Sequence, residues 1–301
     1  MKRVLVTGIS GFIGHHVAEP LAKRGFEVHG VSRNPLPKGG SVIAHHADLL
    51  APGAAAGLIA QVRPSHLLHL AWVNNPGRSM MSPENELWAA ATLDLFRAFA
   101  KAGGKRAAFA GSSAEYDWSH ERLHETETPL RPVTAYGAAK NAVREAIEAE
   151  ARIAGVSSAW GRIFFLYGPH EPPGRLVSEV AAGLAAGNIV KTTRGLQERD
   201  FLYVADAAEA LVMLLDSEVT GAVNIASGEC VPVRQIVETL GRISGRADLL
   251  AMGARPAPPN EPARLAAEVS LLTNEVGFTP RYRLEDGLAA TLQWWRGQLQ
   301  T

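Results

Sequence analysis

The chain has 301 residues, of which 47% are hydrophobic and 20% charged, the composition of an ordinary globular protein. Lys plus Arg and Asp plus Glu each number 30, so no net field draws the protein to nucleic acid or to a membrane. Cys230 is the only cysteine, which excludes an intramolecular disulfide and a metal site built on cysteines.

The N-terminal stretch from Arg3 to Gly14, RVLVTGISGFIG, predicts a strand, a tight turn and the start of a helix. The run Val4 to Val6 is typical of a buried parallel strand, and apolar residues recur at helical spacing from Phe12 to Leu21. Three glycines lie between them at even spacing: Gly8, Gly11 and Gly14. Such a turn presents free N–H groups at a helix N-terminus, so we expect a phosphate-binding loop. A glycine-rich turn without a ligand is the alternative.

A second strand is predicted from Phe26 to Val31, and the residues that follow it bear on the cofactor. A dinucleotide fold that prefers NAD usually carries an acidic residue here, which binds the ribose hydroxyls. This chain has Ser32 and Arg33 instead, and a hydroxyl beside a guanidinium suits a 2′-phosphate. We therefore favour NADP(H) over NAD(H), with a solvated arginine as the alternative.

Strands and helices go on alternating to residue 111, which predicts an α/β protein with a Rossmann-type doubly wound parallel sheet. We expect further strands at 41–46, 66–71 and 105–111, a loop at 72–83 that contains Pro76 and Gly77, and a long helix at 83–102. Asp48, after the third strand, fits a helix N-cap. The histidines in or near these strands match no metal-ligand spacing.

The second half is less regular. We expect helices at 135–154, 176–186, 205–215, 233–244 and 284–299, strands at 156–166, 189–190, 201–204 and 223–226, and a proline-rich loop at 253–262. This pattern predicts a dinucleotide-binding domain over residues 1–166. Residues 167–301 then form mainly a smaller α/β substrate-binding region, with some segments that return to the first domain.

Tyr136 and Lys140 carry the chemistry. They are four residues apart on a predicted helix and so share one face. A lysine charge close to a phenol lowers the phenol pKa, and a phenol so tuned can exchange a proton with a hydroxyl or carbonyl group near neutral pH. A surface pair without function is the alternative.

Several motifs together resemble the extended short-chain dehydrogenases/reductases, in particular the nucleotide-sugar branch of the NAD(P)-dependent epimerase/dehydratase family. The first turn, TGISGFIG, matches TGxxGxxG, and the Tyr136 helix carries YxxxK. RIFFLYGP, RDFLYVAD and NIASG, at residues 162–169, 199–206 and 224–228, and the closing E-x-G-L-x-x-T-x-x-W at 285–294 also resemble family motifs. The resemblance therefore covers essentially the whole chain.

The resemblance implies roles for individual residues. The catalytic hydroxyl stands four residues before Tyr116, at Ser112, and a gapped alignment gives Ser113 instead. Cofactor contacts are implied for Thr7, Gly8, Gly11, Phe12, Ile13, Gly14, Ser32, Arg33, Asp48, Leu49, Leu70, Ala71, Tyr136 and Lys140. Substrate contacts are implied for Ser113, Phe165, Arg199 and Arg264, and the two arginines suit a diphosphate. Phe165 replaces the asparagine common in the family, so we expect a more apolar sugar pocket.

For the reaction, the resemblance implies an NADP(H)-dependent enzyme that reduces a nucleotide-linked 4-keto-6-deoxyhexose, with Tyr136 as proton donor. A nucleotide-sugar 4-epimerase, a reductase of another carbonyl compound and a non-catalytic dinucleotide sensor are the alternatives. Dehydratases of the family carry Asp-Glu after the catalytic hydroxyl. Ser113 and Ala114 stand there, which argues against dehydration unless a gapped alignment moves Glu115 into register.

The resemblance also implies a homodimer through the helices at 83–102 and 135–154. Trp88, Leu95 and Phe99 of the first helix are apolar enough to need cover. No apolar run reaches the length of a membrane span, and the first strand begins too early for a signal peptide, so we expect a cytoplasmic protein.

Overall fold

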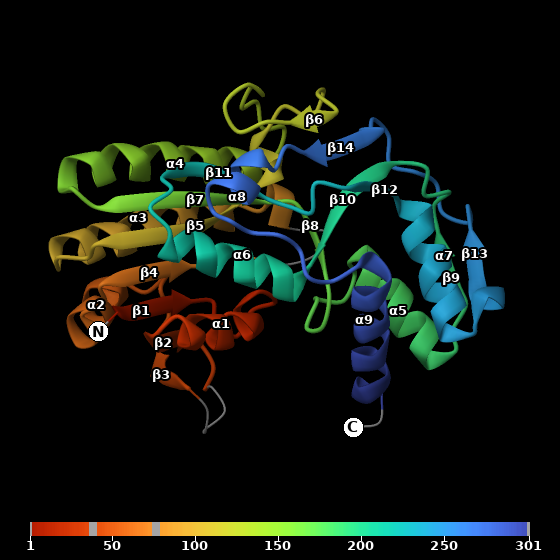
Figure 1. Ribbon diagram of the computed structural model, residues 1–301, viewed down its shortest axis with the longest axis horizontal. Helices are drawn as coiled ribbons and strands as arrows, with labels where there is room; N and C mark the ends of the chain where they lie inside the picture. The colour runs from red at the N-terminus through yellow and green to blue at the C-terminus, as the bar shows by residue number, and fades with distance from the viewer. Residues whose placement is uncertain (1, 36–40, 74–78, 300–301) are drawn as a thin grey trace.

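A computed structural model of the chain describes residues 2–35, 41–73 and 79–299. Its larger part is a seven-stranded sheet with helices on both faces, and a smaller lobe lies beyond one end of that sheet (Figure 1). This arrangement confirms the predicted α/β class. No helix in the described ranges is long and apolar enough to cross a membrane. Pro76 and Gly77 of the predicted 72–83 loop lie outside the described residues.

The large sheet is parallel throughout, in the order β11-β7-β5-β4-β1-β2-β3. Chain order reverses between β1 and β4, and this switch point is where doubly wound sheets bind ligands. The strands are β1 (Lys2–Thr7), β2 (Phe26–Ser32), β3 (Val42–His46), β4 (His66–His69), β5 (Arg106–Ser112), β7 (Ser157–Ile163) and β11 (Gly221–Ile225).

Two apolar cores form, one on each face of the sheet. α1 (Ala18–Lys23), α6 (Val204–Asp216) and α8 (Ser270–Asn274) cover one face. α2 (Ala54–Val62), α3 (Glu84–Lys101) and α4 (Ala135–Ala154) cover the other. β11, α6 and α8 all come from the second half of the chain, so that half contributes to the large sheet and its covering layer.

The first helix differs from the expectation. Residues 12–21 form no continuous helix; a 3₁₀ turn at Gly14–His16 precedes α1, which begins at Ala18. Pro20 has no backbone N–H and is tolerated only in the first turn of a helix. Starting the helix at Ala18 puts Pro20 in that first turn.

The strand expected at 156–166 is two strands that serve different sheets. β7 ends at Ile163 in the large sheet, and β8 (Phe165–Tyr167) pairs with β10 (Glu198–Tyr203) in the smaller lobe. Between them, the Phe164 N–H donates to the carbonyl oxygen of Ile225 at 3.1 Å. The apolar run at 156–166 gives no sign in the sequence that its two halves pair with different sheets, because both halves pack against apolar neighbours.

The smaller lobe has a sheet in the order β12-β10-β14-β6, with β8 beside β10, and a two-stranded β13-β9 sheet. Helices α5, α7 and α9 pack together against these strands (Figure 1). The bounds are β6 (Arg122–Leu123), β9 (Val190–Thr192), β12 (Cys230–Pro232), β13 (Leu250–Met252), β14 (Arg264–Ala267), α5 (Leu176–Ala186), α7 (Val233–Ser244) and α9 (Leu284–Gln298). The sequence analysis missed α2, α8, β6, β12, β13 and β14.

The three apolar residues of α3 that were expected to need cover from a partner subunit are buried within their own subunit. Trp88, Leu95 and Phe99 of α3 are 7%, 0% and 0% exposed, because they pack against the sheet of their own subunit. The outward side of α3 instead carries Leu87, which is 59% exposed. The dimer itself stays a prediction.

Candidate active site

The glycine turn after β1 is packed too closely for larger side chains. Gly8 has φ +71°, and a Cβ there would lie 2.8 Å from the amide nitrogen of Ala71. A Cβ at Gly14 would lie 2.1 Å from the carbonyl oxygen of Gly8. Among the described residues, the N–H groups of Phe12 and Ile13 have no acceptor. Free N–H groups ahead of a helical turn fit the phosphates of a dinucleotide.

The Thr7 side chain connects the end of β1 to the residues after β4 through hydrogen bonds. Its hydroxyl accepts from Leu70 N–H and Ala71 N–H at 3.2 Å and lies 2.8 Å from Nδ1 of His69. His69 Nε2 lies 2.9 Å from the Thr92 hydroxyl, which donates its own hydrogen to the carbonyl oxygen of Trp88. Nε2 must therefore carry the proton, and Nδ1 accepts from Thr7. Burial lowers the pKa of His69 to about 3, so this neutral network fixes the switch point.

The residues expected at the adenosine end lie along the same edge of the sheet. The Ser32 hydroxyl is hydrogen-bonded to the Ser10 hydroxyl at 2.9 Å, and Arg33 beside it is exposed. Asp48 is not the N-cap of α2, which begins six residues later. Its carboxylate accepts from Leu50 N–H in a turn, and Leu49 is buried in the core.

Ser112 and Tyr136 meet at the carboxyl end of β5. The Ser112 side chain lies close to the Tyr136 hydroxyl and acts to lower its pKa. Thr134 caps α4 by accepting from Gly137 N–H at 3.0 Å, which sets Tyr136 in the first turn of that helix. Burial raises the pKa of Tyr136 to about 12, and the neighbouring Ser112 hydroxyl offsets this only in part.

Lys140 does not act on Tyr136 in the expected way. Its Nζ donates to the carbonyl oxygen of Ala110 at 2.8 Å and lies 3.7 Å from the centre of a Trp72 ring, against 5.8 Å from the Tyr136 ring. The ammonium is thus held by β5 and Trp72, a cation–π contact. The expected lowering of the Tyr136 pKa is therefore absent in this structure. Burial lowers the pKa of Lys140 itself to about 7.

Glu115 is a structural residue. Its carboxylate accepts from Ser112 N–H at 2.7 Å, Trp160 Nε1–H at 2.9 Å and Arg162 Nε–H at 2.8 Å. Glu115 is 0% exposed and lies outside the lining of the cavity described next. With these donors bound, it holds Ser112 in place and is not free for proton transfer.

A cavity of about 580 Å³ opens between the large sheet and the smaller lobe. Its walls bring together many of the expected residues, namely Phe12, Ile13, Leu70, Ser112, Ser113, Tyr136, Lys140, Phe165 and Arg199. Thr7, Gly8, Gly11, Gly14, Ser32, Arg33, Asp48, Leu49, Ala71 and Arg264 lie outside this lining. The volume is in the usual range for a small-molecule site.

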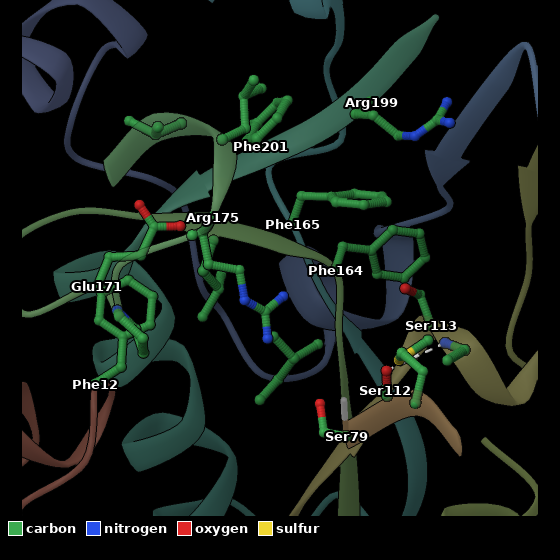
Figure 2. A pocket seen from close by; sticks show the side chains of 18 of the residues that line it. Phe12, Ser79, Ser112, Ser113, Phe164, Phe165, Glu171, Arg175, Arg199 and Phe201 are labelled. Atoms are coloured by element: carbon green, nitrogen blue, oxygen red, sulfur yellow. Dashed lines mark hydrogen bonds between the residues drawn. The ribbon is translucent and has the colours of Figure 1, made fainter. Parts of the chain in front are cut away.

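Arg199 and Phe165 lie in the part of the cavity formed by the smaller lobe (Figure 2). The Arg199 guanidinium is 5.6 Å from the centre of the Phe165 ring and donates to Glu261 Oε1 at 3.0 Å. Arg264 is paired with Glu198 on the exposed side of the same sheet, so its expected contact with substrate has no support from the geometry.

Sequence reasoning missed several lining residues, among them Trp72, Phe164, Glu171 and Arg175. Trp72 directly follows the expected strand end at Ala71, so its position alone could have indicated it. Glu171 and Arg175 follow the YGP segment in HEPPGR, where the glycine and prolines predict only a loop. Figure 2 shows that Arg175 extends into the cavity between Glu171 and Ser112.

These features can now be compared with known proteins. Residues 4–226 match the model of the NAD dependent epimerase/dehydratase family. The chain belongs to this family. As an epimerase/dehydratase family member it is 28% identical to the UDP-glucose 4-epimerase of Streptomyces lividans, over 92% of this chain and 91% of that protein.

Solved structures of the same family have the same fold. The UDP-glucose 4-epimerase of Thermus thermophilus, in complex with NAD, is 27% identical and superimposes with a TM-score of 0.86 over 98% of this chain and 99% of that one. MoeE5, in complex with UDP-glucuronic acid and NAD, is 31% identical with a TM-score of 0.86 and the same coverage of both chains. The protein is thus an enzyme of the NAD-dependent epimerase/dehydratase family.

Proposed function

We propose that the protein moves a hydride between C4 of a nucleotide-linked hexose and a nicotinamide dinucleotide, and that the net reaction is epimerisation at C4. The observation that carries this proposal is that Ser112 and Tyr136 lie together in the wall of a cavity that also contains Arg199. A relative named UDP-glucose 4-epimerase matches over nearly its whole length, which favours epimerisation over net reduction.

The bound nicotinamide would accept and return the hydride, and the residues of this chain would move the proton. In the oxidation at C4, Tyr136 must accept the C4 hydroxyl proton as a phenolate, and in the reduction it gives that proton back to the C4 oxygen as the hydride returns. With a pKa of about 12, Tyr136 is protonated at neutral pH and ready for the second transfer. For the first transfer the phenolate needs a cation nearby. Arg175 lowers the Tyr136 pKa by its charge, and Lys140 lies 5.8 Å from the ring. Ser112 would orient the sugar oxygen toward Tyr136.

The other half of the cavity fits a nucleoside diphosphate. Arg199 is 4% exposed and fixed by Glu261, so its planar guanidinium is already ordered for a diphosphate. Lys191 and Arg255 line the same cavity and add positive charge. Water elimination is disfavoured, because the Glu115 carboxylate is bound by Arg162 and lies outside the lining.

A net reductase is the second candidate, favoured by Ser32 and Arg33 at the end of β2. Neither side chain is acidic, and together they suit a 2′-phosphate, so we propose NADP(H) for this alternative. The test is incubation of purified protein with UDP-hexoses and with nucleotide-linked 4-keto-6-deoxyhexoses, with NADH and NADPH in parallel.

Interconversion of C4 epimers without net change in dinucleotide absorbance supports the epimerase. Stoichiometric loss of NADPH with one ketose supports the reductase. Tyr136→Phe should abolish either activity and leave dinucleotide affinity unchanged. Dinucleotide binding without turnover of any substrate would contradict both enzymatic proposals and favour a sensor.

A further inference from the structure

Glu171 is a buried acid in the cavity wall that the proposed chemistry does not use. It is 4% exposed and lines the cavity. The backbone N–H of Ser178, in the first turn of α5, acts to lower the pKa of the carboxyl group. The carboxyl oxygen Oε2 is buried and has no hydrogen-bond partner in the described part of the chain. A buried polar atom without a hydrogen-bond partner destabilises the folded protein, so its presence needs an explanation.

The segment that carries Glu171 is held rigidly. The Glu171 N–H donates to the carbonyl oxygen of Gly168 at 3.2 Å, and His170 between them has φ +68°, uncommon for a residue other than glycine. On the other side, the Ser178 hydroxyl donates to the carbonyl oxygen of Pro172 at 2.8 Å. The backbone on both sides of Glu171 is therefore held by hydrogen bonds, as expected around a binding residue.

The same segment lies beside the dinucleotide loop and the catalytic residues. His16, in the 3₁₀ turn of that loop, has its Nε2 3.3 Å from the carbonyl oxygen of Pro169. Arg175 carries a charge that acts on both Glu171 and Tyr136. Figure 2 shows Glu171 and Phe12 on the same side of the cavity, with the Arg175 guanidinium reaching toward Ser112. Glu171 is thus near the place where the nicotinamide and the reacting sugar would meet.

We propose that Glu171 binds the ligand directly, donating a hydrogen bond from Oε2–H to an acceptor oxygen. That oxygen is either the amide oxygen of nicotinamide or an oxygen of the hexose. The assignment rests on the proposed function, since it needs both ligands in this cavity.

The protonation state agrees with a donor. Burial raises the pKa of Glu171 to about 8, although Arg175 lowers it, so the group is a neutral acid at pH 7. The other charged or titratable groups on the surrounding elements are His16 and His170, whose pKa values burial lowers, and Glu179 on α5, which is paired with Arg255. A neutral acid has one hydrogen to give, whereas a carboxylate could only accept.

Two variants distinguish a hydrogen-bond donor at residue 171 from an acceptor. Glu171→Gln keeps a neutral donor of the same shape, and Glu171→Met removes it. Glu238→Gln is the matched control, because Glu238 pairs with Arg234 on α7, outside the lining of the cavity. Melting temperatures check that all variants fold. The dissociation constants of NAD⁺, NADP⁺ and UDP-glucose, each titrated alone, are measured from pH 6 to pH 10.

Glu171→Met should raise the dissociation constant of one ligand about tenfold at pH 7, while the dissociation constants of Glu171→Gln and of the control stay within about twofold of wild type. Wild-type affinity for that ligand should fall above pH 8, and Glu171→Gln should remove that fall. Weaker dinucleotide binding identifies the nicotinamide oxygen, and weaker UDP-glucose binding identifies the sugar.

Unchanged binding of all three ligands by Glu171→Met overturns the proposal. Equal losses in Glu171→Gln and Glu171→Met, with no alkaline fall in the wild type, would make Glu171 an acceptor and also overturn it. Wild-type protein that binds no dinucleotide and no UDP-glucose contradicts the proposed function, a result distinct from both.

Discussion

Replacing Glu115 by glutamine should destabilise the protein strongly. The carboxylate accepts three hydrogen bonds, from Ser112 N–H, Trp160 Nε1–H and Arg162 Nε–H, and both Glu115 and Arg162 are essentially inaccessible to solvent. Glutamine supplies one acceptor oxygen and one donor group, so at least one of these donors would face an N–H₂ group. The Arg162 charge would also remain buried without its counter-ion.

Removal of one partner of a buried ion pair costs roughly 3–5 kcal/mol in free energy of unfolding. For a chain of this length that corresponds to a fall in melting temperature of roughly 5–8 °C. Urea denaturation and calorimetry measure both quantities. Glu19→Gln is the control, since Glu19 pairs with Lys23 at the surface with a side chain 76% exposed, and its loss should be under about 1 kcal/mol. A loss for Glu115→Gln as small as that of the control would refute this reasoning.

Three further results are expected. Gly14→Ala should abolish NAD⁺ binding in a fluorescence titration, because its Cβ would lie 2.1 Å from the Gly8 carbonyl oxygen. The control Gly57→Ala, whose Cβ would have nothing within 4 Å, should bind NAD⁺ normally. Equal NAD⁺ affinities of the two variants would contradict this prediction. The contribution of Glu171 to the free energy of unfolding should fall by up to about 1.4 kcal/mol per pH unit as pH rises from 4.5 to about 8, because folded Glu171 keeps its proton over that range. Urea denaturation at several pH values should give Glu171→Gln a shallower slope than wild type, and identical slopes would contradict the assignment. Light scattering should give a dimeric mass, and Leu87→Glu on α3 a monomeric one; a monomeric wild type would contradict the predicted interface.

The sequence was most informative where a local pattern has one physical reading. The glycine turn before an apolar helical stretch predicted both the strand end and the loop, because only glycine fits at Gly8 and Gly14. The predicted helix at 135–154 is present, and its Tyr136 and Lys140, four residues apart, both line the cavity.

Features that depend on contacts between distant segments could not be predicted in this way. The apolar stripe of α3 indicates a buried face but not what covers it, so Trp88, Leu95 and Phe99 were assigned to a partner and not to their own sheet. Lys140 was expected to act on Tyr136, but its Nζ contacts Ala110 and Trp72, which lie in segments far away in sequence. Glu171 carries no motif at all, and only its burial in the folded chain distinguishes it.

Isotope tracing tests whether the hydride leaves and returns at C4 of the sugar with help from Tyr136. Wild-type protein with NAD⁺ is incubated with UDP-glucose, and separately with UDP-glucuronic acid, each carrying deuterium at C4. If hydride transfer at C4 is the mechanism, one of the two substrates forms its C4 epimer with the deuterium retained, because the hydride leaves and returns at the same carbon. Tyr136→Phe should form no epimer. An epimer that has lost deuterium to solvent, or formation by Tyr136→Phe at the wild-type rate, would contradict hydride transfer assisted by Tyr136.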